Sequence, residues 1–352
     1  MPKPETLVIL TPAFPENEAD DNWVPTVQLT VKALKGQFPE KEILVLAFSY
    51  PNHASRYDWN GIRVVSFNGA KYKGRWRRPF FWREIWNELR HIRKECRIIG
   101  IFSFWCGECA FIGHYFGLVH SLRHRCWICG QDAQKENKWV RFIRPRAREL
   151  VAISNFLRRT FHENHGIEPA VVIPNGVDQK LFDLPGEQQQ RDIDILGAGS
   201  LVPLKQYRLL VQTIASLHCH FPSIRAVHCG GGEERQYLEG LAREWGIETN
   251  LQFLGEIPHR QVLQLMQRAK IFLHPSSGEG YSTVCLEALY AGARVISFCD
   301  PADEPVEEWQ VVRDVEEMYT AAAGLLAAPP ASKQVLVHTI GQNARSIMEL
   351  FR

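Results

Sequence analysis

Residues 278–289 of the chain read Gly278-Glu279-Gly280-Tyr281-Ser282-Thr283-Val284-Cys285-Leu286-Glu287-Ala288-Leu289. Glu279 lies between two glycines, which allow a backbone to approach a ligand closely. Glu287 follows eight positions later, about one turn inside a helix that Ser282 or Thr283 can cap. The first amides of such a helix attract phosphate. The stretch therefore predicts two carboxylates for sugar hydroxyls and an amide cradle for a diphosphate, as a nucleotide sugar requires.

Short β-rich apolar runs alternate with amphipathic stretches along the whole chain, which is typical of parallel α/β sheets. In the first half, strands are predicted at 6–11, 42–47, 62–67, 98–103, 126–130, 149–153 and 170–173, with helices at 24–37 and 81–94. In the second half, strands are predicted at 193–198, 224–229, 251–254, 271–274 and 294–298. Residues 184–192 lack periodicity and are interpreted as a linker. We therefore expect one domain at 1–184 and another at 185–352.

The composition supports two domains with cores of their own, since the chain has 352 residues and 45% apolar composition. Residues 1–184 carry 27 Lys and Arg against 19 Asp and Glu, a balance of +8. Residues 185–352 carry 14 against 20, a balance of −6. The basic first half favours an anionic partner such as a lipid headgroup, a membrane surface or an acidic glycan. A solvated basic face explains the same charge equally well.

The chain shows no pattern of a secretory signal, because Met1-Pro2-Lys3-Pro4 leads only to a short apolar run at 7–10. The apolar stretch 98–119 carries Glu108 near its middle, so a buried strand and helix explain it better than a membrane span. Nine cysteines without a signal indicate free thiols in a reducing compartment. We therefore expect a cytoplasmic protein, with peripheral association at the inner membrane surface as a further option.

Two cysteine pairs, Cys106 with Cys109 and Cys126 with Cys129, have a spacing known from zinc sites. The second pair lies in a predicted strand, where positions three apart face opposite sides. Buried thiols are therefore favoured over zinc. No other metal or cofactor is expected, because helix amides and Lys205 can neutralise a diphosphate, and because we interpret the aspartates as scattered, without the Asp-x-Asp pair that metal-dependent transferases use.

Glu279 and Glu287 resemble the E-x7-E motif of retaining GT-B glycosyltransferases, and of glycosyltransferase family 4 in particular. Five further blocks of the chain resemble other motifs of this family and occur in the same order. These blocks are residues 172–178, 194–205, 228–233, 253–255 and 272–276. The resemblance implies an α/β fold, GT-B, of two Rossmann-like doubly wound parallel-sheet domains facing a cleft. It also implies retaining transfer of a hexose-type sugar from a nucleoside-diphosphate sugar to an acceptor hydroxyl, in glycan, polysaccharide or glycolipid biosynthesis.

The same resemblance implies roles for individual residues. Glu287 accepts hydrogen bonds from the ribose, Glu279 contacts the transferred sugar, and the Lys205 ammonium neutralises the β-phosphate as the glycosidic bond breaks. No protein nucleophile is needed, because relatives transfer by front-face attack assisted by the leaving phosphate. The other expected donor contacts are Gly199, Ser200, Gly230, Gly231, Leu254, Gly280, Tyr281, Ser282 and Thr283.

The chain departs from the family pattern at several positions. Ser200 stands where many relatives have an arginine, and Cys129 replaces a histidine often seen in the first domain, so no catalytic histidine is carried over. Asp132 remains a candidate acceptor-side base or sugar contact, with a helix N-cap as an equal alternative. At the carboxyl end, either residues 335–351 make a short return to the first domain or that crossover is missing.

Residues 71–82 interleave five cations with five aromatic side chains. This combination suits an anionic bilayer surface and predicts a lipid-linked acceptor, although a basic loop leading into a helix explains it too. Nothing else in the chain resembles a nucleic-acid-binding module. Two other functions stay open: a sugar-nucleotide epimerase-type GT-B enzyme, and a non-catalytic GT-B scaffold, which Ser200 and Cys129 would favour.

Overall fold

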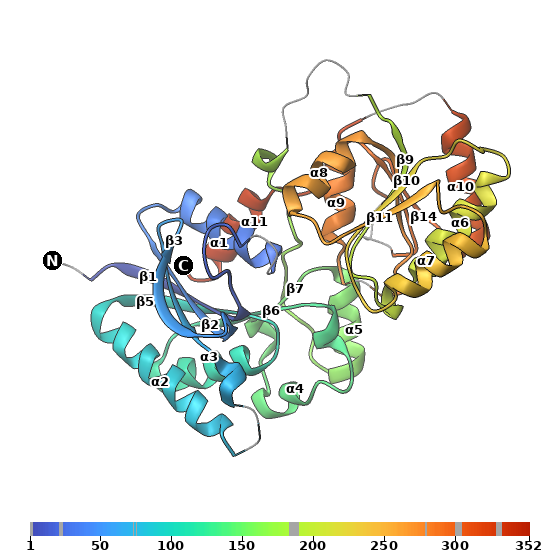
Figure 1. Ribbon diagram of the computed structural model, residues 1–352. Helices are drawn as coiled ribbons and strands as arrows, with labels where there is room; N and C mark the ends of the chain where they lie inside the picture. Colours follow the sequence, from blue (N-terminus) through green and yellow to red (C-terminus); the bar gives the residue numbers. More distant parts are fainter. Residues whose placement is uncertain are drawn as a thin grey trace. The chain divides into compact units, whose positions relative to one another are not determined.

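The structure is a computed structural model that describes residues 3–20, 24–72, 74, 76–182, 190–278, 280–299, 305–328 and 333–352. The chain folds into two compact units (Figure 1). The first unit contains residues 1–175 and 340–352, and the second contains residues 176–339. The expected division at 184/185 is therefore corrected in two respects. The segment from Gly176 belongs to the second unit, and the last thirteen residues belong to the first.

The first unit is built on an eight-stranded sheet with the order β3-β4-β2-β1-β5-β6-β7-β8. Every neighbouring pair is parallel except β3 and β4. The strands are β1 (Glu5–Ala13), β2 (Glu42–Tyr50), β3 (Ala54–Trp59), β4 (Ile62–Phe67), β5 (Arg97–Phe104), β6 (His124–Ile128), β7 (Leu150–Ala152) and β8 (Val171–Val172). The helices are α1 (Pro25–Gln37), α2 (Arg78–Glu95), α3 (Glu108–His120), α4 (Lys138–Ile143), α5 (Asn155–His165) and α11 (Ile340–Glu349), with 3₁₀ turns η1 (Gly69–Tyr72), η2 (Gly130–Ala133) and η3 (Ala147–Glu149).

The antiparallel strand β3 was not predicted. It joins β4 through Asn60 and Gly61, whose φ angles are 50° and 74°. An Asn-Gly pair is the residue choice that a two-residue hairpin turn with positive φ favours. The sequence therefore contained a signal for this hairpin, between the strands predicted at 42–47 and 62–67.

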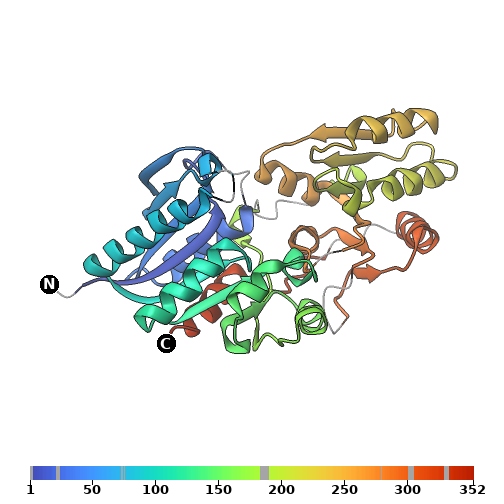
Figure 2. The same ribbon diagram turned by 90° about the horizontal axis from the view of Figure 1, so that it is seen from below.

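The last helix returns to the first unit, so the first of the two expectations for the carboxyl end is confirmed. Helix α11 packs against α1, and the red α11 lies beside the blue and teal elements of this unit in Figure 2. Phe351 fills the space beside Gly100, where an added Cβ would lie 2.0 Å from its ring. Gly100 thus makes room on β5 for the end of the chain.

The second unit has a six-stranded parallel sheet with the order β11-β10-β9-β12-β13-β14. Its strands are β9 (Ile193–Ala198), β10 (Ala226–Cys229), β11 (Leu251–Gly255), β12 (Ala269–His274), β13 (Arg294–Ser297) and β14 (Trp309–Val311). Its helices are α6 (Tyr207–His218), α7 (Arg235–Glu244), α8 (His259–Arg268), α9 (Thr283–Tyr290) and α10 (Val315–Ala327), with 3₁₀ turns η4 (Gln179–Leu181) and η5 (Pro203–Lys205).

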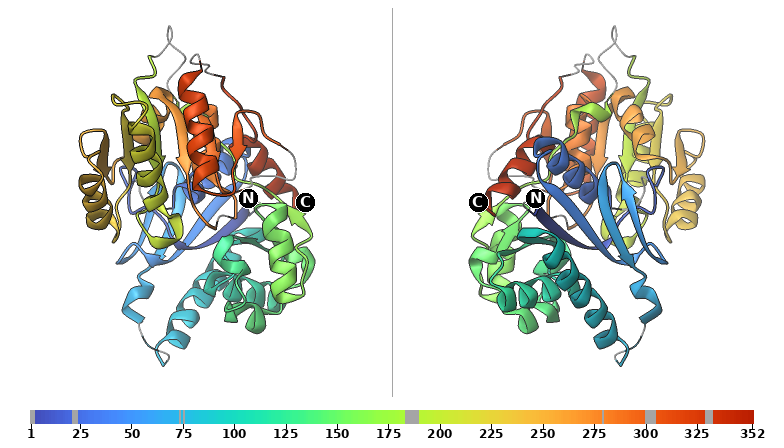
Figure 3. Two further views of the ribbon diagram at one scale, coloured as in Figure 1. Left: turned by 90° about the vertical axis from the view of Figure 1, so that its right-hand side faces the viewer. Right: turned by 90° about the vertical axis from the view of Figure 1, so that its left-hand side faces the viewer.

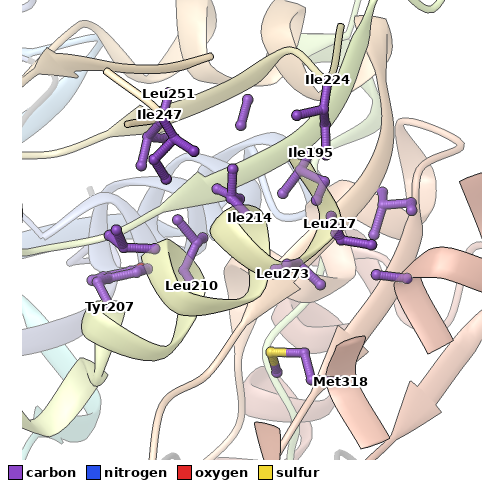
Figure 4. Packing of buried hydrophobic residues seen from close by; sticks show 14 of the residues in the cluster. Ile195, Tyr207, Leu210, Ile214, Leu217, Ile224, Ile247, Leu251, Leu273 and Met318 are labelled. Carbon is purple, nitrogen blue, oxygen red and sulfur yellow. The ribbon is translucent and has the colours of Figure 1, made fainter. Parts of the chain in front are cut away.

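Helices cover both faces of this sheet (Figure 1). On one face α6, α7 and α10 bury an aliphatic core that includes Ile195, Leu210, Ile214, Leu217 and Met318 (Figure 4). On the other face α8 and α9 pack against each other and against the sheet. The chain crosses from β9 toward β10 in one direction and from β12 toward β13 in the other. Loops at the carboxyl ends of β9 and β12 therefore border the crevice in which doubly wound sheets bind ligands.

Among the described residues, no helix combines the length and the apolarity needed to cross a membrane. Residues 98–119, the most apolar stretch of the first half, form most of β5 and α3, as predicted.

Candidate active site

Two loops of the second unit meet at the carboxyl ends of β9 and β12. Ser277 holds them together, because its amide and its hydroxyl both donate to the carbonyl of Leu204, each at 3.1 Å. Lys205 follows Leu204 at the end of η5 and is partly buried. The contact therefore places this cation beside the loop that contains the predicted diphosphate cradle.

The glycines of the neighbouring loops are required by close contacts between backbones. Gly230 has a φ of 131°, and a Cβ there would lie 2.0 Å from the carbonyl oxygen of Gly199. Gly199 donates its amide to Cys229 at 2.9 Å and Gly230 donates its amide to Gly255 at 2.8 Å. At Gly231 a Cβ would lie 3.1 Å from the Glu256 side chain. These glycines were predicted as ligand contacts, and the structure gives them a packing role as well.

Glu287 lies one turn inside α9, as the sequence predicted, with only 7% of its surface exposed. One of its carboxylate oxygens is 2.9 Å from Nε2 of His259, the first residue of α8. A buried carboxylate is costly unless it has a partner, and His259 supplies that partner and orients the Glu287 side chain. Sequence reasoning missed His259, since a histidine in the first turn of an amphipathic helix looks like a surface residue.

Tyr281 carries a buried hydroxyl in the same loop. Its side chain is 8% exposed, burial raises the pKa of its phenol, and the described residues offer its oxygen no hydrogen-bond partner. A buried hydroxyl without a partner is uncommon in a protein interior. Tyr281 can therefore donate to a polar group of a ligand bound in this loop.

The predicted cap of α9 is corrected by the structure. The helix begins at Thr283, and Ser282 occupies the N-cap position without a side-chain capping bond. The Ser282 hydroxyl instead lies 3.3 Å from Nε2 of His274, at the end of β12. Gly280 and Thr283 flank it and are partly buried. Glu279 lies outside the described residues.

The remaining predicted donor contacts lie around the same loops. Ser200 follows Gly199 and is exposed, and Leu254 is partly buried near the end of β11. The structure thus gathers Lys205, Ser200, Gly199, Gly230 and Glu287 at one edge of one sheet, although these residues span almost ninety positions of sequence.

Family models match nearly the whole chain. The model of glycosyl transferases group 1 matches residues 183–340, and the model of Glycosyltransferase Family 4 matches residues 27–181. The chain belongs to glycosyltransferase family 4. It has the GT-B fold, and the site described above lies in the segment matched by the group 1 model.

Curated relatives agree with this family. The gpi3 subunit of phosphatidylinositol N-acetylglucosaminyltransferase from Schizosaccharomyces pombe is 27% identical over 214 residues, which are 58% of this chain and 47% of the relative. A D-inositol 3-phosphate glycosyltransferase from Corynebacterium urealyticum is 32% identical over 155 residues, which are 39% of this chain and 36% of the relative. The chain thus spans less than half of the length of these two relatives.

Solved structures share the fold. Sucrose-phosphate synthase from Thermosynechococcus elongatus superposes with a TM-score of 0.71 at 16% identity, covering 99% of this chain and 95% of that one. HepE from Anabaena, solved in complex with UDP-glucose, superposes with a TM-score of 0.69 at 16% identity, covering 97% and 94%. At these identities the likeness shows the GT-B fold alone.

One aspartate pair of this family 4 chain was overlooked in the sequence. Asp192 and Asp194 form an Asp-x-Asp pair, so the interpretation of the aspartates as scattered was wrong. Asp192 directly precedes β9, and Asp194 is the second residue of this strand. Both lie at the amino end of β9, and the donor loops lie at its carboxyl end. Asp192 pairs with Arg268 at 2.6 Å, and Asp194 pairs with Lys270 at 2.7 Å. Both carboxylates are thus already engaged in ion pairs outside the candidate site.

Asp132 of the first unit is buried in the turn η2 after β6. Its carboxylate accepts the Cys129 amide at 2.8 Å, and its own position is the third of the turn, not the N-cap that was the alternative. Burial raises the pKa of Asp132 to about 7, although the amides of Cys129 and Cys106 favour the ionised form. The structure therefore gives Asp132 the task of closing this turn.

The four cysteines nearby do not form a metal site in the structure. Among the described residues, no group of three or more His, Cys, Asp or Glu side chains could hold a metal ion. Strand β6 ends at Ile128, between Cys126 and Cys129, and the thiol of Cys126 contacts that of Cys106. Burial raises the pKa of Cys126 and of Cys129.

The basic and aromatic stretch 71–82 divides into a structural part and an exposed part. Arg78 pairs with Glu108 at 2.7 Å and donates to the Gly69 carbonyl at 3.1 Å, while Phe81 is fully buried. Trp76 and Phe80 are 88% and 66% exposed. Lys73 and Arg75 lie outside the described residues. The expectation that all these cations face a membrane is therefore corrected for Arg78, which stabilises the start of α2.

Proposed function

We propose that the chain is a retaining, metal-independent hexosyltransferase that moves a sugar from a nucleoside-diphosphate sugar to a hydroxyl of a lipid-linked, anionic acceptor. The observation that carries the donor half of this proposal is the buried Glu287. Its carboxylate is fixed by His259 at 2.9 Å, at the edge of the sheet where doubly wound folds bind nucleotides.

In this proposal each residue has a separate task. Glu287 accepts hydrogen bonds from the ribose with the carboxylate oxygen that His259 leaves available. Lys205 neutralises charge on the leaving diphosphate, where a preorganised cation is most effective. The Tyr281 hydroxyl donates to a phosphate or sugar oxygen, and Glu279 contacts the transferred sugar. No divalent metal takes part, because the only Asp-x-Asp pair in the sequence is held in ion pairs with Arg268 and Lys270.

The acceptor class follows from the relatives and from a surface of the first unit. Two relatives are named for phosphatidylinositol and inositol 3-phosphate, which are phosphorylated polyols. A phosphorylated headgroup also matches the +8 charge of residues 1–184. We therefore take a hydroxyl of an anionic glycolipid as the acceptor.

An aromatic face on α2, α3 and α4 supports a position at a membrane. It is defined by the exposed side chains of Trp76, Phe80 and Phe142 and by a row of three neighbouring rings. In this row the ring centroids of Trp82 and Phe111 lie 4.9 Å apart, and those of Phe111 and Trp139 lie 5.6 Å apart. Figure 3 shows η1 and the start of α2 extending away from the sheet of the first unit.

Exposed cations stand close to these residues in the sequence, namely Arg77 before α2, Arg83 on α2 and Arg141 on α4. Each cation near an anionic surface contributes about 1 kcal/mol, and amphipathic rings add interfacial affinity. We place the enzyme at the cytoplasmic face of a membrane, bound reversibly through this aromatic face.

The proposal is tested by incubating the chain with a panel of nucleoside-diphosphate hexoses and with liposomes that contain anionic glycolipids or phosphatidylinositol. The expected result is a glycosylated lipid whose new anomeric centre, read by NMR, keeps the donor configuration. EDTA should leave the rate unchanged. A changed sugar nucleotide without a glycosylated product would support the epimerase-type enzyme, and binding without any turnover would support the scaffold.

A further inference from the structure

Two cysteines of the second unit converge beside the donor loop. Cys285 lies in the first turn of α9 and is fully buried, whereas Cys299 follows β13 and is partly exposed. His274 ends β12 and pairs in register with Ser297 of β13. The ends of two neighbouring strands and the start of one helix thus bring two thiols, an imidazole and a hydroxyl to one place.

The contacts within this group are specific. The Cys299 thiol lies beside the side chains of Cys285, His274 and Ser297. On its other side the imidazole of His274 lies 3.3 Å from the hydroxyl of Ser282. The Ser297 hydroxyl also donates to the Cys299 carbonyl at 2.8 Å, which fixes the backbone that carries the thiol.

These contacts favour the thiolate of Cys299. The neighbouring Cys285 thiol is the largest cause, and His274 and Ser297 add to it, so that the pKa of Cys299 falls to about 5 although burial opposes ionisation. A thiolate that is partly exposed and lies beside a second thiol has the chemistry of a reactive dithiol. None of the tasks assigned above to Glu287, Lys205 or Tyr281 uses this chemistry.

We propose that Cys285 and Cys299 form a redox-active dithiol that a peroxide converts into a disulfide. In the first step the Cys299 thiolate attacks one peroxide oxygen, the O–O bond breaks, and hydroxide leaves and takes up a proton to give water and a sulfenic acid. In the second step the Cys285 sulfur displaces the sulfenic hydroxyl, which leaves as a second water. Two thiols are oxidised, one peroxide is reduced, and a thiol reductant reverses the change.

The disulfide would regulate the site assigned under the proposed function, on which this consequence rests. Cys285 stands two positions before Glu287 and two after Thr283. A bond from Cys285 to the end of β13 would pull on the first turn of α9, so nucleotide affinity should fall by about tenfold on oxidation and return on reduction.

The test begins with the bond itself, which does not depend on any transferase activity. The chain is treated with hydrogen peroxide, alkylated, and digested with trypsin without reduction. Cys285 falls in the peptide 271–294 and Cys299 in the peptide 295–313, because Lys270, Arg294 and Arg313 delimit them. We expect these two peptides to appear as a disulfide-linked pair that separates after reduction.

The chain supplies two internal controls. Cys106 and Cys126 also contact each other, but both are fully buried, and they fall in peptides 98–123 and 126–135. This pair should stay reduced. Cys219 is exposed and reports whether oxidant was sufficient. Oxidation of Cys219 without the 285–299 link, or equal linkage of the buried pair, would overturn the proposal.

Variants separate the dithiol from its regulatory effect. Cys285→Ser should leave a sulfenic acid on Cys299 that dimedone traps, and Cys299→Ser should abolish both the link and the trapping. Nucleotide binding is then measured on oxidised and reduced protein by calorimetry with a nucleoside diphosphate. A linked protein with unchanged affinity would overturn the regulatory role, and a chain that never binds a nucleotide would overturn the proposed function while the dithiol stands.

Discussion

The loops at the carboxyl ends of the two sheets are built on different principles. In the second unit the loops contact each other through their backbones. Gly199 contacts Gly230, and the Ser277 amide of the β12 loop donates a hydrogen bond to the Leu204 carbonyl. In the first unit, the turn after β6 is closed by the buried carboxylate of Asp132. Close contacts between backbones require glycines, so a site shaped by the main chain can be recognised in the sequence from its glycine pattern. A turn closed by a side chain requires no such pattern and cannot be recognised in this way.

The largest expected effect comes from breaking the backbone contact. Gly230→Ala should destabilise the chain by about 4 kcal/mol or prevent folding, because its Cβ would lie 2.0 Å from the Gly199 carbonyl at a φ of 131°. Thermal and urea unfolding measure the change. The matched control is Gly240→Ala in α7, where a Cβ meets nothing within 4 Å and the helix should gain up to about 1 kcal/mol. Equal stability of both variants would refute the packing role.

The next effect concerns the turn of the first unit. Burial raises the pKa of Asp132 from 3.8 to about 7, so the folded chain holds this proton more tightly than the unfolded chain does. The resulting contribution to the free energy of unfolding is complete below pH 3.8 and is lost as the pH rises through 7. Asp132→Asn should remove about 2 to 3 kcal/mol of pH dependence between pH 5 and 8. Unfolding curves of both proteins at the two pH values test this, and parallel pH profiles would contradict it.

A smaller effect is expected at His259. His259→Ala should raise the dissociation constant of the donor nucleotide by about tenfold with little change in kcat, because Glu287 loses a charge-assisted hydrogen bond. His259→Gln, which can still donate to Glu287, should restore most of the affinity. If alanine and glutamine behave alike, or kcat falls instead of affinity, His259 does not act by positioning Glu287.

The smallest effect is at the aromatic face. Trp76→Ser with Phe80→Ser should reduce co-sedimentation with anionic liposomes several-fold at low salt, because these rings are exposed and can insert at a bilayer surface. Phe156→Ser on α5 is the matched control, since Phe156 is 50% exposed on another helix. The aromatic face does not bind membranes if wild-type co-sedimentation stays constant as the salt concentration rises, or if Phe156→Ser reduces co-sedimentation as much as the double variant does.

Sequence reasoning worked best where the backbone imposes the pattern. It located β4 at 62–67 and β9 at 193–198 without error, and it placed Glu287 one turn inside a helix. Apolar alternation and glycines at strand ends are local signals, so they can be read from the chain directly. The same reasoning overlooked β3, although Asn60 and Gly61 are typical of the turn that follows it. It also overlooked β14, which has only three residues.

What it missed depends on distant side chains. Arg78 was assigned to a membrane surface because its partner, Glu108, is thirty positions away and cannot be paired with it from the sequence. His259 and Glu287 are separated by 28 positions, and only the packing of α8 on α9 unites them. The return of α11 to the first unit likewise required the three-dimensional fold, since residues 335–351 fitted two alternatives.

We expect the loops after β9 and β12 to bind a nucleoside diphosphate through Glu287, and calorimetric titration with nucleoside diphosphates tests this most directly. The wild type should bind one of them, and Glu287→Ala should weaken binding by about 100-fold, since a hydrogen bond to a charged group contributes up to about 3 kcal/mol. Glu316→Ala, an exposed glutamate on α10, should bind as the wild type does. Glu279→Ala should mainly reduce transfer. Wild-type affinity in the Glu287→Ala protein, or no binding of any nucleoside diphosphate by the wild type, would contradict the account.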